Sequence, residues 1–359
     1  MTEAIASLRP PAATESARIE HMQDIDRVRS AFIDPVEFWT SPLYRHLCDV
    51  VAEDPALVAL AAHARAGQQP TFAFFGAIHA LLLGGVEHEL GDYYVSLRGE
   101  HARAPEGAGP ALQSFADEYA DEIRQILRTR LVQTNHVQRA IGLRLGLAAI
   151  ADRIGNAPVH LLEVGSSAGL LLRHAEYGYR LGDRMFGNAA SPVQVVCEWR
   201  GPEPAPDLDR VPRIASTTGI DLNPLDPADP ADRLWLEALV WPEDRHKARQ
   251  LRTALGVAAG SLVTVLTGDA IELCPQWAAG LPAGDARVVF HCATRMHVPA
   301  DRRPLFDDAI ASTGSEGPLY RIAIEGDGIA VTDPDGTTTV RYDVEGHLAW
   351  ARSAAAVTE

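Results

Sequence analysis

From residue 158 onward, short apolar runs alternate with stretches of helical periodicity, and this alternation constrains the fold more than any other feature. The apolar runs are Pro158–Val164, Val193–Trp199, Ile214–Leu222, Leu262–Thr267, Arg287–Cys292 and Leu319–Ile324. The helical stretches are Ala231–Val257, Ile271–Ala279 and Ala300–Ser312. Strands separated by helices predict an α/β fold with a mostly parallel sheet covered on both faces. Gly328–Thr332 and Thr337–Val344 flank a turn and predict a C-terminal antiparallel hairpin.

The chain before residue 158 has helical patterns and little strand signal. The expected helices are Ala17–Phe32, Pro42–Ala52, Ala56–Ala66, Phe72–Leu83, Ala111–Leu131 and Asn135–Arg153. We therefore expect a flexible tail at 1–17 and an all-helical N-terminal or cap domain at 18–153. The sheet domain is expected at 154–359, with an insertion at about 178–213.

Composition excludes several classes of partner. The net charge of −16 and the lack of a Lys/Arg-rich run disfavour nucleic-acid binding. The four cysteines form no CxxC pair, so we expect buried thiols in a reducing cytoplasm and no metal site. The first residues lack the pattern of a secretory signal. The apolar stretch Phe72–Gly84 is too short to cross a membrane. Oligomeric state stays open.

The block Leu161–Leu170 is an apolar strand that ends in an acid and continues into a turn of small residues. Gly165 and Gly169 permit backbone shapes that a Cβ hinders. The amides of a helix beginning after this turn would favour polar or anionic ligand groups. The polar side chains of the block are Glu163, Ser166 and Ser167. The pattern predicts a ligand site at the end of the first strand.

Two later strands also end in acids. Asp221 and Asn223 follow the run that begins at Ile214, and Asp269 and Ala270 follow the run that ends at Thr267. Because ligands of open α/β sheets bind along the carboxyl edge, the ordered acids predict one shared site. Asp221 lies beyond the roughly 20-residue interval usual for an acid that binds a ribose, so Glu198 competes for that role. An Asx-Pro turn and a helix cap are the structural alternatives for the two aspartates.

The three strand ends resemble the motifs of class I S-adenosylmethionine (SAM) dependent methyltransferases. The resemblance implies a Rossmann-like core, SAM as cofactor and a small-molecule methyl acceptor. It also implies that Asp221 binds the ribose hydroxyls and that Asp269 accepts from the adenine amino group. The turn GSSAG departs from the family's GxGxG. The expected strand Arg287–Cys292 ends in Phe290–Ala293 in place of an Asn/Asp-Pro-Pro-aromatic tetrad, which leaves the acceptor chemistry open.

Two residues near the later strand ends are candidates for acid-base chemistry. His291 is either a base near the methyl donor or a core histidine with a satisfied nitrogen. Glu325 directly follows the expected strand Leu319–Ile324 and is a candidate pocket acid. We therefore place His291 and Glu325 as the catalytic candidates.

The chain between about residues 40 and 325 also resembles a bacterial family known only as a domain of unknown function. The segments that carry this resemblance are Ser41–Tyr44, Val132–Asn135, Leu161–Leu170, Gly219–Asp226 and Ala238–Glu243. That family implies a fold and no activity. Within these segments, Asn135 is expected either to cap the next helix or to contact the methionine end of SAM.

Two other functions fit parts of the same sequence. Gly165–Gly169 also matches GxSxG, so Ser167 could be the nucleophile of an α/β-hydrolase. The helical pattern before residue 158 argues against that fold, in which several strands precede the nucleophile. The second alternative is a SAM-core protein that binds a partner or senses the cofactor without catalysis.

Overall fold

The computed structural model describes residues 22–33, 35, 38, 40–155, 157–260, 263–326 and 328–354. It has two compact units, Met1–Thr134 with Ala228–Arg252, and Asn135–Pro227 with Thr253–Glu359. The expected tail at 1–17 lies outside the described residues. The units do not follow the boundary expected near residue 153, because Asn135–Ile154 belongs to the second unit and 228–252 to the first.

The described part of the first unit is built from helices. Its α-helices are α2 Ile25–Ile33, α3 Pro42–Glu53, α4 Pro55–Ala61, α5 Pro70–Leu83, α6 Val95–Arg98, α7 Ala108–Glu118, α8 Ala120–Thr129 and α10 Pro230–Ala238. Short 3-10 turns are η3 Glu89–Tyr93, η4 Gly99–His101 and η5 Pro105–Gly107. Proline stands at the start of α3, α4, α5 and α10, where a missing amide costs nothing.

Two helices expected as continuous are each broken. Ala111–Leu131 divides at Tyr119, whose φ of −113° and ψ of 24° are not helical. Ala231–Val257 divides into α10 and α11, Arg245–Ala258, because Pro242 lies between them and disfavours helix at the residue before it. The α10 segment joins the first unit through Trp235, which packs against Gly76 and donates from Nε1 to the Leu131 carbonyl at 2.8 Å.

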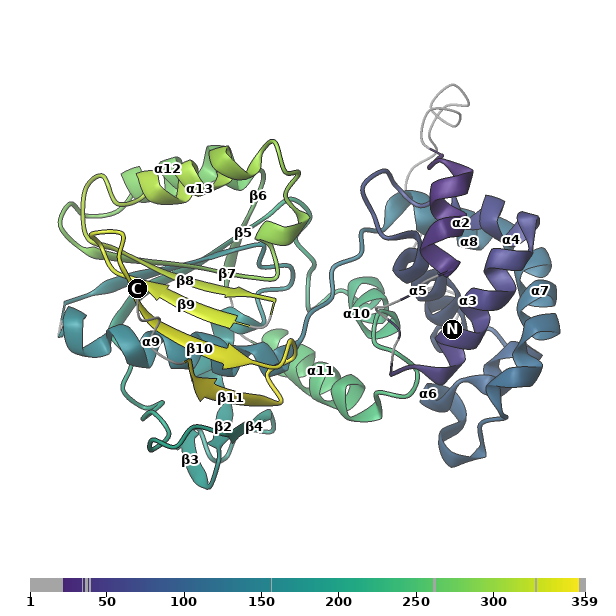
Figure 1. Cartoon of the computed structure of the whole chain (residues 1–359), viewed down its shortest axis with the longest axis horizontal. Coiled ribbons are helices and arrows are strands. Elements are labelled where there is room, and N and C mark those ends of the chain that lie inside the picture. The colour runs from purple at the N-terminus through teal and green to yellow at the C-terminus, as the bar shows by residue number, and fades with distance from the viewer. Residues whose placement is uncertain are drawn as a thin grey trace. The chain divides into compact units, whose positions relative to one another are not determined.

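The second unit is an eleven-stranded sheet with helices on both faces (Figure 1). Its strands are β1 Val159–Val164, β2 Gly178–Leu181, β3 Arg184–Gly187, β4 Gln194–Trp199, β5 Ile214–Asp221, β6 Thr264–Thr267, β7 Ala286–Cys292, β8 Leu319–Glu325, β9 Gly328–Thr332, β10 Thr338–Val344 and β11 Trp350–Ser353. Their order is β3-β2-β4-β11-β10-β9-β8-β7-β1-β5-β6. The five strands β8-β7-β1-β5-β6 are parallel, and β8, β9 and β10 pair antiparallel.

Each face of the parallel strands has its own cover. Helices α12 Ala270–Ala279 and α13 Arg303–Ser312 pack on one face, in a core that includes Leu162, Ile220 and Val289. Helix α9, Ala140–Ile154, covers the other face, where Gly142 and Gly146 bring its backbone against β8. The α/β fold class and the C-terminal hairpin are therefore confirmed. Sequence patterns missed β2, β3 and β11, which are four residues each.

No helix within the described ranges is both long and apolar enough to cross a lipid bilayer.

Candidate functional site

The strand order marks one position on the carboxyl edge of the sheet. After β1 the chain forms β2, β3 and β4 at one end of the sheet. It then adds β5 and β6 on one side of β1, and later β7 and β8 on the other side. Such a reversal of strand order is where open α/β sheets bind ligands. The strand ends that meet there are those of β1, β5 and β7, because β1 pairs with both of the others.

The turn after β1 is tightly curled. Gly165 has φ +80°, Ser167 has φ +50° and Gly169 has φ +64°. A Cβ on Gly165 would lie 2.4 Å from Thr294 Oγ1, so this glycine is required by a close contact within the protein. The helix expected over Leu170–His174 is a six-residue 3-10 helix, η7 Leu171–Glu176, which departs from helical angles at Arg173. The expected helix N-terminus is therefore not the source of ligand contacts.

Three polar atoms near this turn are buried and have no hydrogen-bond partner among the residues that the structure describes. They are Glu163 Oε2, Ser166 Oγ and Ser167 Oγ. The Glu163 residue is 2% exposed, and burial together with the charge of Asp221 raises its pKa well above the ordinary value. Buried polar atoms are nearly always paired in native proteins, so such a group requires an explanation.

Asp221 joins the end of β5 to the turn after β1. Its Oδ2 accepts from the Ser167 amide at 2.7 Å, and its Oδ1 accepts from the Asn223 amide at 2.8 Å. Because Glu163 and Gly219 are paired in register, strand alternation puts Glu163 and Asp221 on the same face of the sheet. We call Glu163, Ser166, Ser167 and Asp221 the turn cluster.

The remaining residues expected to bind the cofactor are distributed differently. Asp269 caps α12 through the Ile271 amide at 2.9 Å and pairs with Arg302 at 2.9 Å, and Ala270 is the first residue of that helix. Glu198 lies on β4, is exposed and pairs with Arg200, so it is not brought together with the other acids. Asn135 caps no helix, because the N-cap residues of η6 Val137–Arg139 and of α9 are His136 and Arg139.

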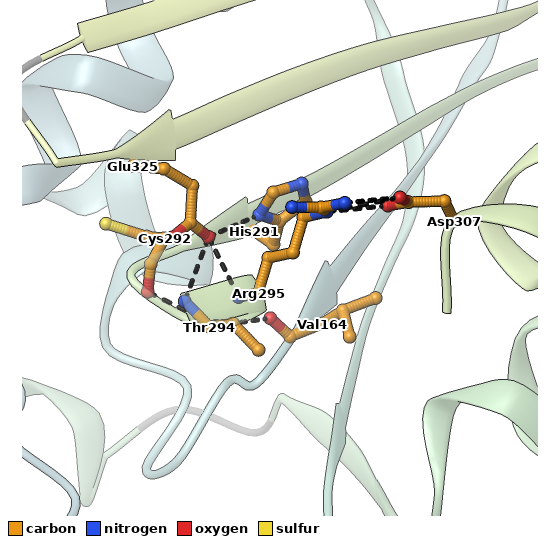
Figure 2. A network of polar contacts seen from close by, with 7 residues as sticks. All are labelled: Val164, His291, Cys292, Thr294, Arg295, Asp307 and Glu325. Carbon is orange, nitrogen blue, oxygen red and sulfur yellow. Dashed lines mark hydrogen bonds and ion pairs between the residues drawn. The ribbon is translucent and has the colours of Figure 1, made fainter. Parts of the chain in front are cut away.

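The catalytic candidates form one hydrogen-bonded network, as Figure 2 shows. His291 Nδ1 lies 2.7 Å from Glu325 Oε1, and the same oxygen accepts from the amides of Thr294 and Arg295 at 3.0 Å. Burial acts to raise the Glu325 pKa, but the hydrogen bonds and the charge of His291 outweigh it, so the pKa is lowered. The carboxylate thus fixes the orientation of the imidazole.

A second ion pair completes this network. Arg295 holds Asp307 of α13 through a bidentate contact, with Nη2 at 2.7 Å from Oδ2 and Nε at 2.9 Å from Oδ1. Thr294 Oγ1 donates to the carbonyl of Val164 at 3.1 Å and so ties the loop after β7 to the end of β1. We call His291, Thr294, Arg295, Asp307 and Glu325 the histidine cluster.

Sequence patterns identified His291 and Glu325 separately and missed their three partners. Thr294 and Arg295 lie just after the end of β7, a position at the carboxyl edge that could have marked them. Asp307 lies in the middle of a helix and carries no such signal. No group of three or more His, Cys, Asp or Glu residues in the described ranges could hold a metal ion.

In the first unit, two segments of the suspected bacterial family lie together. Glu243 accepts from Ser41 Oγ at 2.8 Å and from the Leu43 amide at 3.0 Å, at the start of α3. Tyr44 stacks on Phe75 with ring centroids 4.6 Å apart. These family residues therefore stabilise the helical core of the first unit rather than the carboxyl edge of the sheet.

A comparison with known protein families identifies the bacterial family that the sequence resembles. The model of a family described as "uncharacterized protein conserved in bacteria (DUF2332)" matches residues 36–356. No curated protein matches the sequence. A solved structure similar to this chain is an S-adenosylmethionine-dependent methyltransferase from Clostridium acetobutylicum ATCC 824, with 8% identity, a TM-score of 0.24, and coverage of 68% of this chain and 79% of that one.

Proposed function

The chain belongs to this bacterial family, and we propose that its carboxyl-edge site binds SAM and that the protein transfers a methyl group to a small molecule. The observation that supports the proposal most is the set of unpartnered polar atoms in the turn cluster. A ligand that forms hydrogen bonds there would satisfy atoms whose burial is otherwise costly.

The chemistry of the turn cluster fits this cofactor. A buried carboxyl oxygen of Glu163 suits an ammonium group, because an opposite charge favours the ionised carboxylate that burial disfavours. The Asp221 carboxylate, next to the turn, suits the two hydroxyls of a ribose. Ser166 and Ser167 offer hydroxyls that can donate or accept.

Adenine recognition is assigned in this proposal to Asp269 and Ala270. The Asp269–Arg302 pair is partly solvent-exposed, with side-chain exposures of 30% and 48%. Exposed pairs of this kind contribute roughly 0–1 kcal/mol, so an amino group can compete for the same carboxylate. The amide of Ala270 is the second expected contact.

When bound, SAM supplies an activated methyl group on a sulfonium centre with a neutral leaving group. The residues of this chain then position the acceptor and handle its proton. Glu325 holds His291 Nδ1, so in the neutral imidazole Nε2 is the nitrogen that carries the free lone pair. His291 is the proposed general base, and Glu325 is a positioning residue. The net charge of −16 favours a small acceptor over a nucleic acid.

We also propose that the protein acts in the cytoplasm. All four cysteines are free, as a reducing compartment requires.

Calorimetric titration with SAM and with S-adenosylhomocysteine tests the assignment. We expect binding by the unaltered chain and at least a tenfold loss in Glu163→Gln and in Asp221→Asn. Glu198→Gln is the matched control, since Glu198 is an exposed strand-end acid away from the turn, and it should leave affinity unchanged. If neither ligand binds the unaltered chain, the proposal is wrong. Binding without any methyl transfer would support the non-catalytic SAM-core alternative.

One observation favours the hydrolase alternative. Ser167 has φ +50°, a conformation that is uncommon for a residue other than glycine and typical of a strained nucleophile turn. Its Oγ is buried and has no hydrogen-bond partner among the described residues, so no histidine is in place to activate it. Loss of esterase activity in Ser167→Ala would favour this alternative.

A further inference from the structure

A serine, a histidine and an aspartate form a hydrogen-bonded chain at the amino edge of the sheet, opposite the site described above. His160 is the second residue of β1, Ser216 the third residue of β5, and Asp285 directly precedes β7. His160 pairs in register with Ser216, so the two side chains lie on the same face.

The hydrogen bonds have the order of a nucleophile, a base and an orienting acid. His160 Nδ1 lies 2.7 Å from Ser216 Oγ, and His160 Nε2 lies 3.0 Å from Asp285 Oδ2. An ionised aspartate can only accept, so the neutral imidazole carries its proton on Nε2. The lone pair on Nδ1 then accepts the Ser216 hydroxyl proton, which is the protonation state that activates a serine.

Asp285, the acid of this hydrogen-bonded triad, is held in place by its surroundings. The Asp285 amide donates to the Pro282 carbonyl, and the Asp285 carbonyl accepts from the fully buried Arg287. A Cβ on Gly317 would lie 2.0 Å from Arg287 Nη1, so this glycine makes room for the guanidinium. A fixed acid keeps the imidazole in one tautomer and one orientation.

His160 is the most shielded member of the three. The His160 side chain is 9% exposed and the Asp285 side chain 27%, and Ser216 is half-buried. Ser216 therefore keeps part of its surface exposed, while the base beside it stays largely shielded from water.

We propose that Ser216, His160 and Asp285 form a second reactive site that takes small carboxylic esters. Ser216 Oγ bonds to the carbonyl carbon while its proton passes to His160 Nδ1. The ester C–O bond then breaks, and the departing alcohol takes that proton. Water next cleaves the acyl–Ser216 bond by the same proton transfers. An alcohol leaves more readily than an amine. Esters therefore need less stabilisation of the transition state than amides do.

Labelling with a fluorophosphonate probe, read by mass spectrometry of the intact chain and its peptides, tests this site. We expect one phosphonyl group on Ser216, none there in Ser216→Ala, and a labelling rate at least tenfold lower in Asp285→Asn, which keeps the size of the side chain. Ser30→Ala, at an exposed serine of α2 whose Oγ donates to the Asp26 carbonyl, is the control and should label as the unaltered chain does. Hydrolysis of a p-nitrophenyl ester should fall in parallel.

Circular dichroism and thermal melting establish that each variant is folded. An unlabelled Ser216 in the folded chain overturns the proposal, as does a labelling rate that Asp285→Asn leaves unchanged. Modification of Ser167 in place of Ser216 overturns it too and supports the hydrolase alternative. The inference does not depend on SAM binding, because the two sites lie at opposite edges of the sheet.

Discussion

The turn cluster and the histidine cluster occupy the same edge of one sheet but differ in how their acids are paired. Glu163 is buried with an oxygen that has no partner, and its pKa is raised. Glu325 accepts three hydrogen bonds on one oxygen, and its pKa is lowered. A satisfied carboxylate stabilises the fold, whereas an unsatisfied one costs stability that only a ligand can restore. This difference separates the residues proposed to bind cofactor from those proposed to orient a base.

The strongest effect of a single substitution at neutral pH is expected at Gly165, which adjoins the turn cluster and lies against Thr294 of the histidine cluster. In Gly165→Ala, the new Cβ would meet Thr294 Oγ1 at 2.4 Å, at a backbone φ of +80°. We expect this change to lower the free energy of unfolding by about 3 kcal/mol, from strain and overpacking together. Gly169→Ala has a φ of +64° but its nearest neighbour lies at 3.5 Å, so it should cost only about 1–2 kcal/mol.

Chemical denaturation of both glycine variants measures these losses of unfolding free energy. The same measurement is made on the double variant that combines Gly165→Ala with Thr294→Ala. The double variant should recover about half of the loss in Gly165→Ala, since the strain at φ +80° remains. Equal losses in the two glycine variants would mean that the contact with Thr294 does not constrain the turn.

The second prediction is that Glu163→Gln and Glu325→Gln change the stability of the fold in opposite directions. Glu163→Gln removes a group whose ionisation is disfavoured, so without ligand it should raise stability at pH 8 by about 2 kcal/mol. Glu325→Gln weakens hydrogen bonds to a charged acceptor and should lower stability by about 1–2 kcal/mol, a value reduced for its partial exposure.

The pH dependence follows from the two pKa directions. The Glu163 pKa is raised in the fold, so the unaltered chain loses stability as pH rises from the ordinary glutamate pKa toward that raised value. The Glu325 pKa is lowered, so its contribution is present above the ordinary value and is lost as pH falls through the folded one. Melting curves from pH 2 to pH 9 check both, because the Glu325 contribution is lost below the ordinary glutamate pKa. A loss of stability in both variants at pH 8 would contradict the contrast between the clusters.

The sequence predicted the parts of this edge that depend on local pattern. Apolar runs located the parallel strands, and each acid at a strand end was identified from its position. Pairing was not predictable, because the contact between His291 and Glu325 joins residues 34 apart through the register of β7 and β8. The short 3-10 helix after the turn was also missed, since Leu170–His174 has the same apolar pattern as the start of a longer helix.

The third prediction concerns the stability of the fold at acid pH. His174 lies in η7, directly after the turn cluster, where burial and then the charge of Arg144 lower its pKa to about 3. The unfolded chain therefore binds a proton below about pH 6.5 that the folded chain does not. Stability should fall by up to about 1.4 kcal/mol for each pH unit between 6.5 and 3.

Acid titration of His174→Gln, followed by near-UV circular dichroism, measures that contribution. The variant should have a shallower slope than the unaltered chain across this window and a similar melting temperature at pH 8. An unchanged slope would mean that His174 is not the group that limits acid stability near the turn.

The smallest effect is expected at Ser166, and it tests the premise of the comparison most directly. Ser166 Oγ is buried without a partner, whereas Ser312 Oγ donates to the Ala309 carbonyl at 2.7 Å. Without ligand, Ser166→Ala should leave stability unchanged or raise it by about 0.5 kcal/mol, while the matched control Ser312→Ala should lower it by about 0.5–1 kcal/mol. With SAM present, Ser166→Ala should become the more destabilising of the two changes. It then removes a ligand contact and should weaken SAM binding about tenfold. A greater loss from Ser166→Ala than from Ser312→Ala in the ligand-free chain would show that the hydroxyl is already satisfied, and the turn cluster would no longer differ from the histidine cluster.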